Sequence, residues 1–179
     1  MMSMGHAARR IGRRGAVLAA ALAALAGGGC ARGSRQPPAT DASLKAVAAA
    51  VRRDVYDRPV ALSPLLAGRV VLYFFRTDCP HCAPQVAAAP GLAARPGTPP
   101  LVLISREGPA RLRAALGAQP LAGLVVLSDS AGTIMGEALP TRFVPRVVAV
   151  KRFAVVLDVT GDRGFGLAGA VASLSGDLR

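Results

Sequence analysis

The sequence predicts an α/β fold in which helices flank a central, mixed but mostly parallel sheet. Short apolar runs alternate along the chain with segments of helical periodicity, and this alternation is typical of an α/β fold with a mainly parallel sheet. The runs are apolar throughout rather than at every second position, which is typical of strands buried on both faces. A length of 179 residues favours one folded domain.

The first half of the chain contains four expected elements. An acidic start followed by apolar residues at helical spacing predicts a helix over 41–53. Pro59 and Pro64 bracket a short extended piece, and the apolar, β-branched and aromatic run Val70–Phe75 predicts a buried strand. A helix is expected directly after this strand, from Cys79 to Ala94.

The second half continues the alternation of strands and helices. Leu101–Ser105 predicts a second buried strand, and a helix with one apolar face is expected over Glu107–Ala118. Three more strands and two more helices are expected, the strands at Leu124–Leu127, Arg146–Val150 and Ala154–Val159 and the helices at Ala131–Leu139 and Phe165–Leu174. The last two strands are close enough in sequence to form an antiparallel hairpin.

The N-terminal segment has the features of an export signal. Four arginines and no acid precede Gly15–Ala26, a wholly apolar run. The run is shorter than the roughly 20 apolar residues that a membrane span needs. We therefore expect a signal over 1–29, a linker over 30–40 and the folded domain over 41–179, which places the domain on the extracytoplasmic or periplasmic side of the cell envelope.

The exit of this signal, Leu25–Cys30, resembles a bacterial lipoprotein signal with Cys30 as the lipid-attachment residue. Small residues precede Cys30 as in that pattern, although Gly27 stands where leucine is usual. The alternative is cleavage after Ala26, which leaves a soluble exported protein with Cys30 as a free thiol. We favour the lipid anchor.

Charge and cysteine content narrow the function. The formal charge is +12, and removal of the signal leaves 18 basic against 10 acidic residues, a charge of +8. No basic run is interleaved with aromatic residues, so nucleic acid is not an expected partner. Beyond Cys30 the chain has two cysteines, Cys79 and Cys82, and one histidine, His81. Two cysteines three residues apart constrain almost no chain, and a structural zinc site needs four ligands, so neither a disulfide scaffold nor a metal site is expected.

Redox chemistry is the function that remains for the motif Cys79-Pro80-His81-Cys82. If a helix starts at Cys79, this residue lies at the exposed helix tip and Cys82 lies one turn inside. Unpaired backbone N–H groups and the helix dipole then stabilise a Cys79 thiolate. Cys79 is the expected nucleophile, Cys82 resolves the mixed disulfide with the substrate, and Pro80 rigidifies the first turn.

The stretch Leu66–Phe75 running into this motif resembles the active-site entry of envelope thioredoxins of the TlpA/ResA type. The Pro-His dipeptide is similar to that of oxidants of the DsbA type. The resemblance covers about 62–174 and implies a thioredoxin-like fold and a membrane-facing dithiol exchanger without a bound cofactor. It also implies a cis-proline opposite the cysteines, which we assign to Pro145, with the Val144 backbone available to pair with a substrate peptide.

Two positions depart from this family. Asp78 stands where a tryptophan usually precedes the first cysteine, and Tyr73 stands where thioredoxins and DsbA-type proteins carry a buried acid. A phenol cannot act as a base at neutral pH, so water or another group must take the Cys82 proton. Asp78 raises the expected pKa of Cys79 and Arg76 lowers it. We expect His81 to favour the Cys79 thiolate and to make the pair more oxidising than thioredoxin.

Three other functions fit the sequence less well. A peroxiredoxin-like peroxidase needs Thr or Ser three residues before the reactive cysteine, whereas Thr77 is two before Cys79. Copper carriers of this fold usually have a C-x-x-x-C motif and a distant histidine, which the sequence lacks. A binding module that lost its activity does not fit the intact cysteine pair. The substrate is not assigned by the sequence: it is either cytochrome c apoprotein or other protein thiols or disulfides of the envelope. The sequence also leaves a membrane redox partner open.

Overall fold

The computed structural model describes residues 36–49, 51–117, 122–161 and 166–175. The predicted signal and Cys30 lie outside these residues. The compact unit to which the described residues belong begins at Gln36, ahead of Asp41, where the sequence predicted the domain to start. Within the described residues no helix combines the length and the hydropathy that a membrane span requires.

A five-stranded mixed sheet forms the centre of the domain, as the sequence predicts. Its strands run in the order β5-β4-β3-β6-β7. The first three in this order are parallel, whereas β6 is antiparallel to β3 and forms a hairpin with β7. The strands span Arg69–Phe74 (β3), Leu101–Ser105 (β4), Leu124–Ser128 (β5), Arg146–Lys151 (β6) and Ala154–Thr160 (β7).

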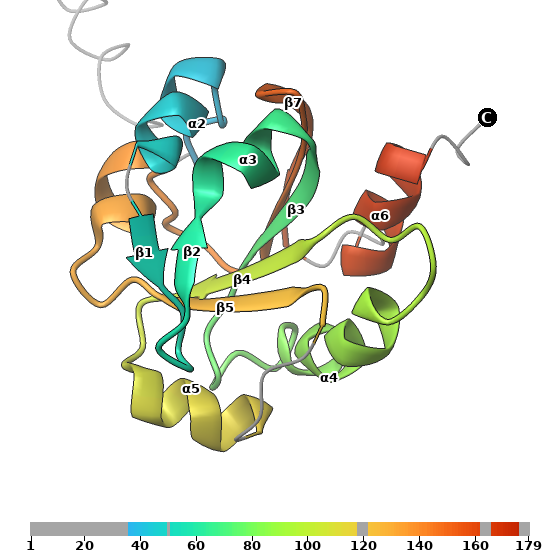
Figure 1. Cartoon of the computed structure of the whole chain (residues 1–179). Helices are drawn as coiled ribbons and strands as arrows, with labels where there is room; N and C mark the ends of the chain where they lie inside the picture. The colour runs from blue at the N-terminus through green and yellow to red at the C-terminus, as the bar shows by residue number, and fades with distance from the viewer. Residues whose placement is uncertain (1–35, 50, 118–121, 162–165, 176–179) are drawn as a thin grey trace, which may run out of the picture. The chain divides into compact units, whose positions relative to one another are not determined.

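Helices cover both faces of this sheet (Figure 1). One face packs its odd-numbered β3 residues, Val71 and Tyr73, in a core with side chains of α4 (Ala83–Ala93), α5 (Pro109–Leu116) and α6 (Leu167–Ser175). The other face packs the even-numbered residues in a second core with side chains of α2 (Asp41–Ala48), α3 (Leu62–Ala67) and the π-helix η1 (Thr133–Ala138). Burial on both faces explains why the inner strands β3 and β4 are apolar at nearly every position.

The first predicted helix is too long. Helix α2 ends at Ala48, and the last residues of the predicted helix form the short strand β1, Val51–Arg53. This strand pairs antiparallel with β2, Pro59–Ala61. The buried carboxylate of Asp54 accepts hydrogen bonds of 2.9 Å from the backbone N–H groups of Tyr56 and Arg58, so it closes the turn between the strands. Tertiary pairing thus overrides helical spacing, and helix α3 follows where no helix was predicted.

Candidate active site

Cys79 and Cys82 form a disulfide at the carboxyl end of β3, with their Cα atoms 5.2 Å apart. Cys82 is fully buried in the core shared with α4 and α6, whereas Cys79 is half-buried. The backbone N–H of Cys82 lies 3.2 Å from the Cys79 sulfur in donor geometry. The sequence predicted this unequal burial, with Cys79 on the solvent side and Cys82 shielded.

The helix that follows begins later than predicted. Helix α4 starts at Ala83 rather than at Cys79, and Cys82 is its N-cap residue. The Cys79 carbonyl accepts hydrogen bonds from the N–H groups of Cys82 at 3.0 Å and Ala83 at 3.1 Å, so a tight turn leads directly into the helix. Proline does lie in the first helical turn, but it is Pro84 and not Pro80. This shift retains an N-terminal helix end beside the disulfide.

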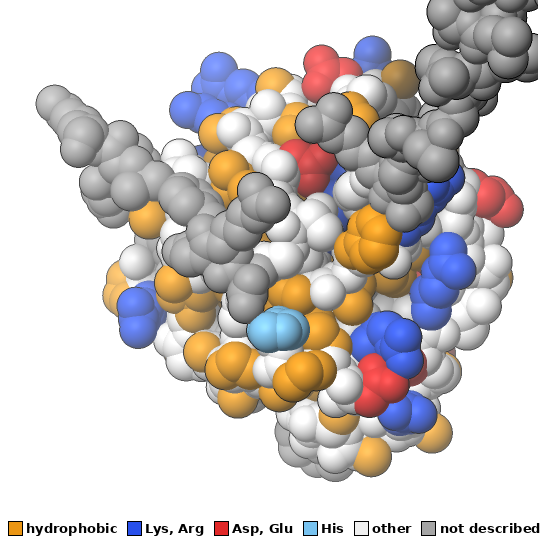
Figure 2. Space-filling model, turned by 180° about the vertical axis from the view of Figure 1, so that it is seen from behind, with side chains coloured by type: hydrophobic (Ala, Val, Ile, Leu, Met, Phe, Trp, Pro, Cys, Tyr) orange, Lys and Arg blue, Asp and Glu red, His pale blue; other side chains and the backbone are white. Residues whose placement is uncertain are grey.

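Pro80 and His81 occupy the exposed turn between the two cysteines. Figure 2 shows hydrophobic side chains gathered on the face that carries the histidine. An exposed position beside Cys79 is compatible with the role predicted for His81. The effect of its ring on the cysteine pair stays a prediction.

The loop before Cys79 is held by a polar network that sequence reasoning missed. The Glu107 carboxylate, which is only 15% exposed, accepts hydrogen bonds from the Thr77 N–H at 2.8 Å and the Thr77 hydroxyl at 2.7 Å. Ser105 donates to it at 3.1 Å, and Arg111 forms an ion pair with it at 3.0 Å. An acid at the start of a predicted helix gives no sequence signal of such a contact.

The charges that flank Cys79 pair with each other. Arg76 and Asp78 form an exposed ion pair with an N–O distance of 2.6 Å. The hydrogen bond from Arg76 lowers the pKa of Asp78, so this carboxylate stays ionised well into the acidic range. Because the two opposite charges are adjacent, we expect their effects on the pKa of Cys79 largely to cancel.

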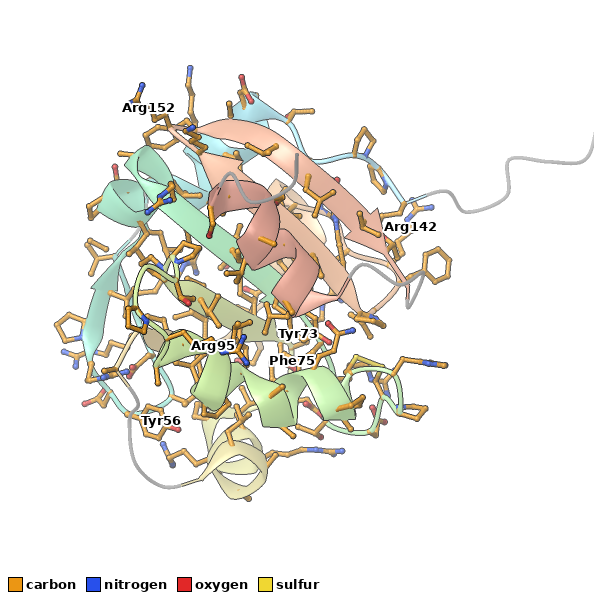
Figure 3. The ribbon with its side chains drawn as sticks, turned by 90° about the vertical axis from the view of Figure 1, so that its right-hand side faces the viewer. Tyr56, Tyr73, Phe75, Arg95, Arg142 and Arg152 are labelled. Carbon is orange, nitrogen blue, oxygen red and sulfur yellow. A yellow bond between two sulfur atoms is a disulfide. The ribbon has the colours of Figure 1, made fainter. Side chains whose placement is uncertain are left out.

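Tyr73, which stands where thioredoxins carry a buried acid, is a fully buried residue of the core that contains Cys82. Its ring stacks on Phe75 with centroids 6.2 Å apart, and Figure 3 labels both rings beside helix α4. Its hydroxyl has no hydrogen-bond partner among the described residues, and burial raises its pKa above the ordinary tyrosine value. Tyr73 therefore stays neutral and cannot serve as a base for Cys82.

The predicted proline lies at the same end of the sheet as the disulfide. The Val144–Pro145 peptide bond is cis. Strand β6 starts directly after it, and Arg146 pairs in register with Phe74 at the end of β3. Val144 and Cys79 both pack against the core that contains Cys82. The structure therefore brings Val144 and the cysteine pair to the same end of the central strands. Binding of a peptide at Val144 stays a prediction.

A groove of 270 Å³ lies beside the motif, between the end of β3 and helices α4 and α5. Its lining is mainly apolar and includes Phe75, Thr77, Ala83, Val86, Pro90 and Leu116. It begins at the first residue of α4, one residue beyond Cys82. Among the described residues no cluster of three or more histidine, cysteine, aspartate or glutamate side chains could hold a metal ion.

Comparisons with known proteins show the fold. A secreted disulfide oxidoreductase of Mycobacterium tuberculosis, described as homologous to Escherichia coli DsbE, superimposes with a TM-score of 0.60 and 18% identity, covering 73% of this chain and 98% of that one. The exposed lipoprotein thioredoxin Etrx1 of Streptococcus pneumoniae gives a TM-score of 0.58 and 19% identity, with coverages of 72% and 98%. The domain thus has a thioredoxin-like fold.

A third similar structure is that of Mycobacterium tuberculosis DsbF in its mixed oxidised and reduced forms. Its TM-score is 0.55 at 18% identity, and the match covers 65% of this chain and 87% of that one. No protein-family model matches the sequence. No curated protein matches it either. Because one fold supports many activities, function has to be argued from the site.

Proposed function

We propose that this protein is a thiol–disulfide oxidoreductase that exchanges the Cys79–Cys82 disulfide with thiols of exported proteins. The observation that carries the proposal is the unequal burial of the two sulfurs at the N-terminal end of α4. Cys79 is half-buried and Cys82 fully buried, so an incoming thiolate can approach only the Cys79 sulfur. The thioredoxin-like fold of disulfide oxidoreductases such as the mycobacterial protein supports it.

The exchange takes place in two balanced displacements. A substrate thiolate attacks the Cys79 sulfur, a mixed disulfide forms, and the Cys79–Cys82 bond breaks with Cys82 leaving as a thiolate. A second substrate thiolate then attacks the substrate sulfur of the mixed disulfide and releases the Cys79 thiolate. Two electrons pass from the substrate dithiol to the cysteine pair, and the two protons are shared with solvent. In the reverse direction the Cys79 thiolate attacks a substrate disulfide and Cys82 resolves the intermediate.

Buried Cys82 takes up or loses its proton without help from Tyr73. The raised pKa of Tyr73 leaves its hydroxyl protonated, so the phenol can donate or accept a hydrogen bond but is not a base for the Cys82 proton. Water at the half-buried Cys79 edge is then the proton carrier. This arrangement is compatible with exchange, but Tyr73 does not supply the base that would speed deprotonation of the Cys82 thiol when it resolves a mixed disulfide.

The proposal includes an envelope location, with Cys30 as a lipid anchor. Two of the similar structures belong to a secreted protein and to an exposed lipoprotein. These descriptions support the location that the N-terminal sequence predicts. The expected partners are protein thiols or disulfides at the extracytoplasmic face and a membrane redox partner that resets the cysteine pair.

Three single variants test the proposal in a glutathione redox buffer. Cys79→Ser should abolish exchange at the motif, because the remaining cysteine there, Cys82, is fully buried. In Cys82→Ser the Cys79 thiolate should attack oxidised glutathione once and release one glutathione. The variant should then accumulate a mixed glutathione disulfide, detected as a mass increase. Cys30→Ser is the matched control, which should exchange at the parent rate. The proposal fails if the parent does not exchange, or if the mixed disulfide forms at Cys30 instead of Cys79.

A further inference from the structure

Arg146 is a fully buried charge that directly follows Pro145. Its guanidinium has five N–H donors, and the structure supplies an acceptor for each. Asp158 of β7 accepts two of them, at 2.9 Å from Nε and 2.8 Å from Nη2. The remaining acceptors belong to three other residues, at 3.1 Å for the Pro140 carbonyl, 3.2 Å for the Thr141 hydroxyl and 3.0 Å for the Pro37 carbonyl.

These acceptors come from segments far apart in the sequence. Pro140 and Thr141 belong to the loop that leads to Val144, while Pro37 belongs to the N-terminal segment, 109 positions away from Arg146. The Asp158 carboxylate also accepts the backbone N–H of Ala39 at 2.6 Å. Breaking such a buried, fully paired charge leaves its partners unsatisfied, which is strongly destabilising. Arg146 therefore fastens the N-terminal segment and the loop to the sheet.

Gln36 makes a second connection between the same two segments. Its side-chain N–H donates to the Pro140 carbonyl at 3.0 Å. Its carbonyl oxygen accepts the backbone N–H groups of Arg142 at 2.9 Å and Phe143 at 3.2 Å. Figure 3 shows Arg142 where the described chain begins. The half-buried amide of Gln36 thus binds three backbone groups of the loop that ends at Val144.

We propose that Gln36 and Arg146 are positioning residues that hold the Val144 backbone in place for an incoming peptide. The inference rests on the proposed function. It adds that the N-terminal segment helps to form the site at which the Val144 backbone would pair with a substrate peptide. Neither residue touches a reacting sulfur. Their loss should therefore weaken the use of an extended peptide, which needs main-chain pairing at Val144, and should spare a small dithiol, which does not.

The test compares two reductants of the oxidised full chain: an extended peptide with two cysteines, and dithiothreitol. For Gln36→Ala the half-saturating peptide concentration should rise about fivefold, as expected for the loss of neutral hydrogen bonds. The maximal rate with peptide and the rate with dithiothreitol should stay unchanged. Arg146→Lys keeps the positive charge but loses the planar set of guanidinium donors. It should also raise the half-saturating peptide concentration.

Ser43→Ala is the matched control, because it removes the capping interaction of α2 in the same N-terminal region without touching the loop. It should leave both the half-saturating peptide concentration and the rate with dithiothreitol unchanged. Hydrogen exchange gives a readout that does not need activity: in Gln36→Ala the Arg142 and Phe143 amides should exchange faster. Unchanged exchange of these amides, or an equal loss with peptide and dithiothreitol, overturns the inference. A parent that reacts with neither reductant contradicts the proposed function instead.

Discussion

At the residue scale, the buried hydroxyl of Tyr73 is an unusual feature of the core around the cysteine pair. The Tyr73 hydroxyl is buried without a hydrogen-bond partner among the described residues, and an unsatisfied buried polar group destabilises the folded state. Tyr73→Phe should therefore raise the free energy of unfolding by about 1 kcal/mol, measured by denaturant titration. The exchange rate should not fall, because the neutral phenol is not a base. A loss of stability would instead mean that the hydroxyl has a partner, such as a bound water.

His81 is the residue on which we expect the direction of electron flow to depend. A ring that donates to the Cys79 thiolate, or is charged beside it, favours the reduced form of the pair. We expect a reduction potential between about −270 mV, the thioredoxin value, and about −120 mV, the DsbA value. His81→Ala should raise the Cys79 pKa and make the potential more negative, measured in a glutathione buffer. If neither quantity moves, His81 has no part in setting the direction.

The loop before Cys79 is held through Thr77, which donates two hydrogen bonds to Glu107 and accepts one from Arg111 at 2.9 Å. Glu107→Ala removes the hydrogen bonds to both Thr77 groups, and should lower the free energy of unfolding by about 2 kcal/mol, as expected for bonds to a charged acceptor. The Thr77 amide should also lose protection from hydrogen exchange. Arg111→Ala is the comparison variant, because its side chain is 60% exposed, so its ion pair with Glu107 and its hydrogen bond to the Thr77 hydroxyl should together contribute less than about 1 kcal/mol. Equal effects of both variants would contradict a specific role for Glu107.

The inner strands β3 and β4 were predictable because burial on both faces makes nearly all of their residues apolar. Leu101–Ser105 is found at its predicted bounds, and β3 differs from its prediction by one residue at each end. Helix ends were less predictable. The helical spacing before Arg53 continues into a strand, because pairing of β1 with β2 outweighs local periodicity. The start of α4 at Ala83 likewise follows from a turn that the spacing of the cysteines does not reveal.

The cysteine pair could be found from its motif, but the residues that support it could not. Glu107 and Gln36 act through contacts between segments distant in sequence, which leave no local pattern. Arg146 gave a weak signal, since a charge opens an otherwise apolar strand directly after Pro145. A charge at a position expected to be buried requires partners, so the sequence contains enough to single out Arg146, although not to name the residues that pair with it.

At the scale of the whole molecule, two sets of hydrogen bonds hold the two loops that lie at the carboxyl end of β3. Glu107 holds the loop before Cys79, and the pair Gln36 and Arg146 holds the loop before Pro145. One support arises from the β4–α5 connection and the other includes the N-terminal segment. The positions of the two loops beside the disulfide therefore depend on the β4–α5 connection and on the first residues of the described chain.

The N-terminal sequence makes a prediction about the mature protein. If Cys30 is acylated, the mature chain should begin at this residue, its mass should exceed that of the bare polypeptide, and it should sediment with membranes. Cys30→Ala should move the protein to the soluble fraction or leave it unprocessed, while the Cys79–Cys82 pair keeps its exchange rate in vitro. Mass spectrometry of the mature N-terminus separates the two predicted cleavage sites. An unmodified Gly27 at that terminus would show that the protein is exported without a lipid anchor.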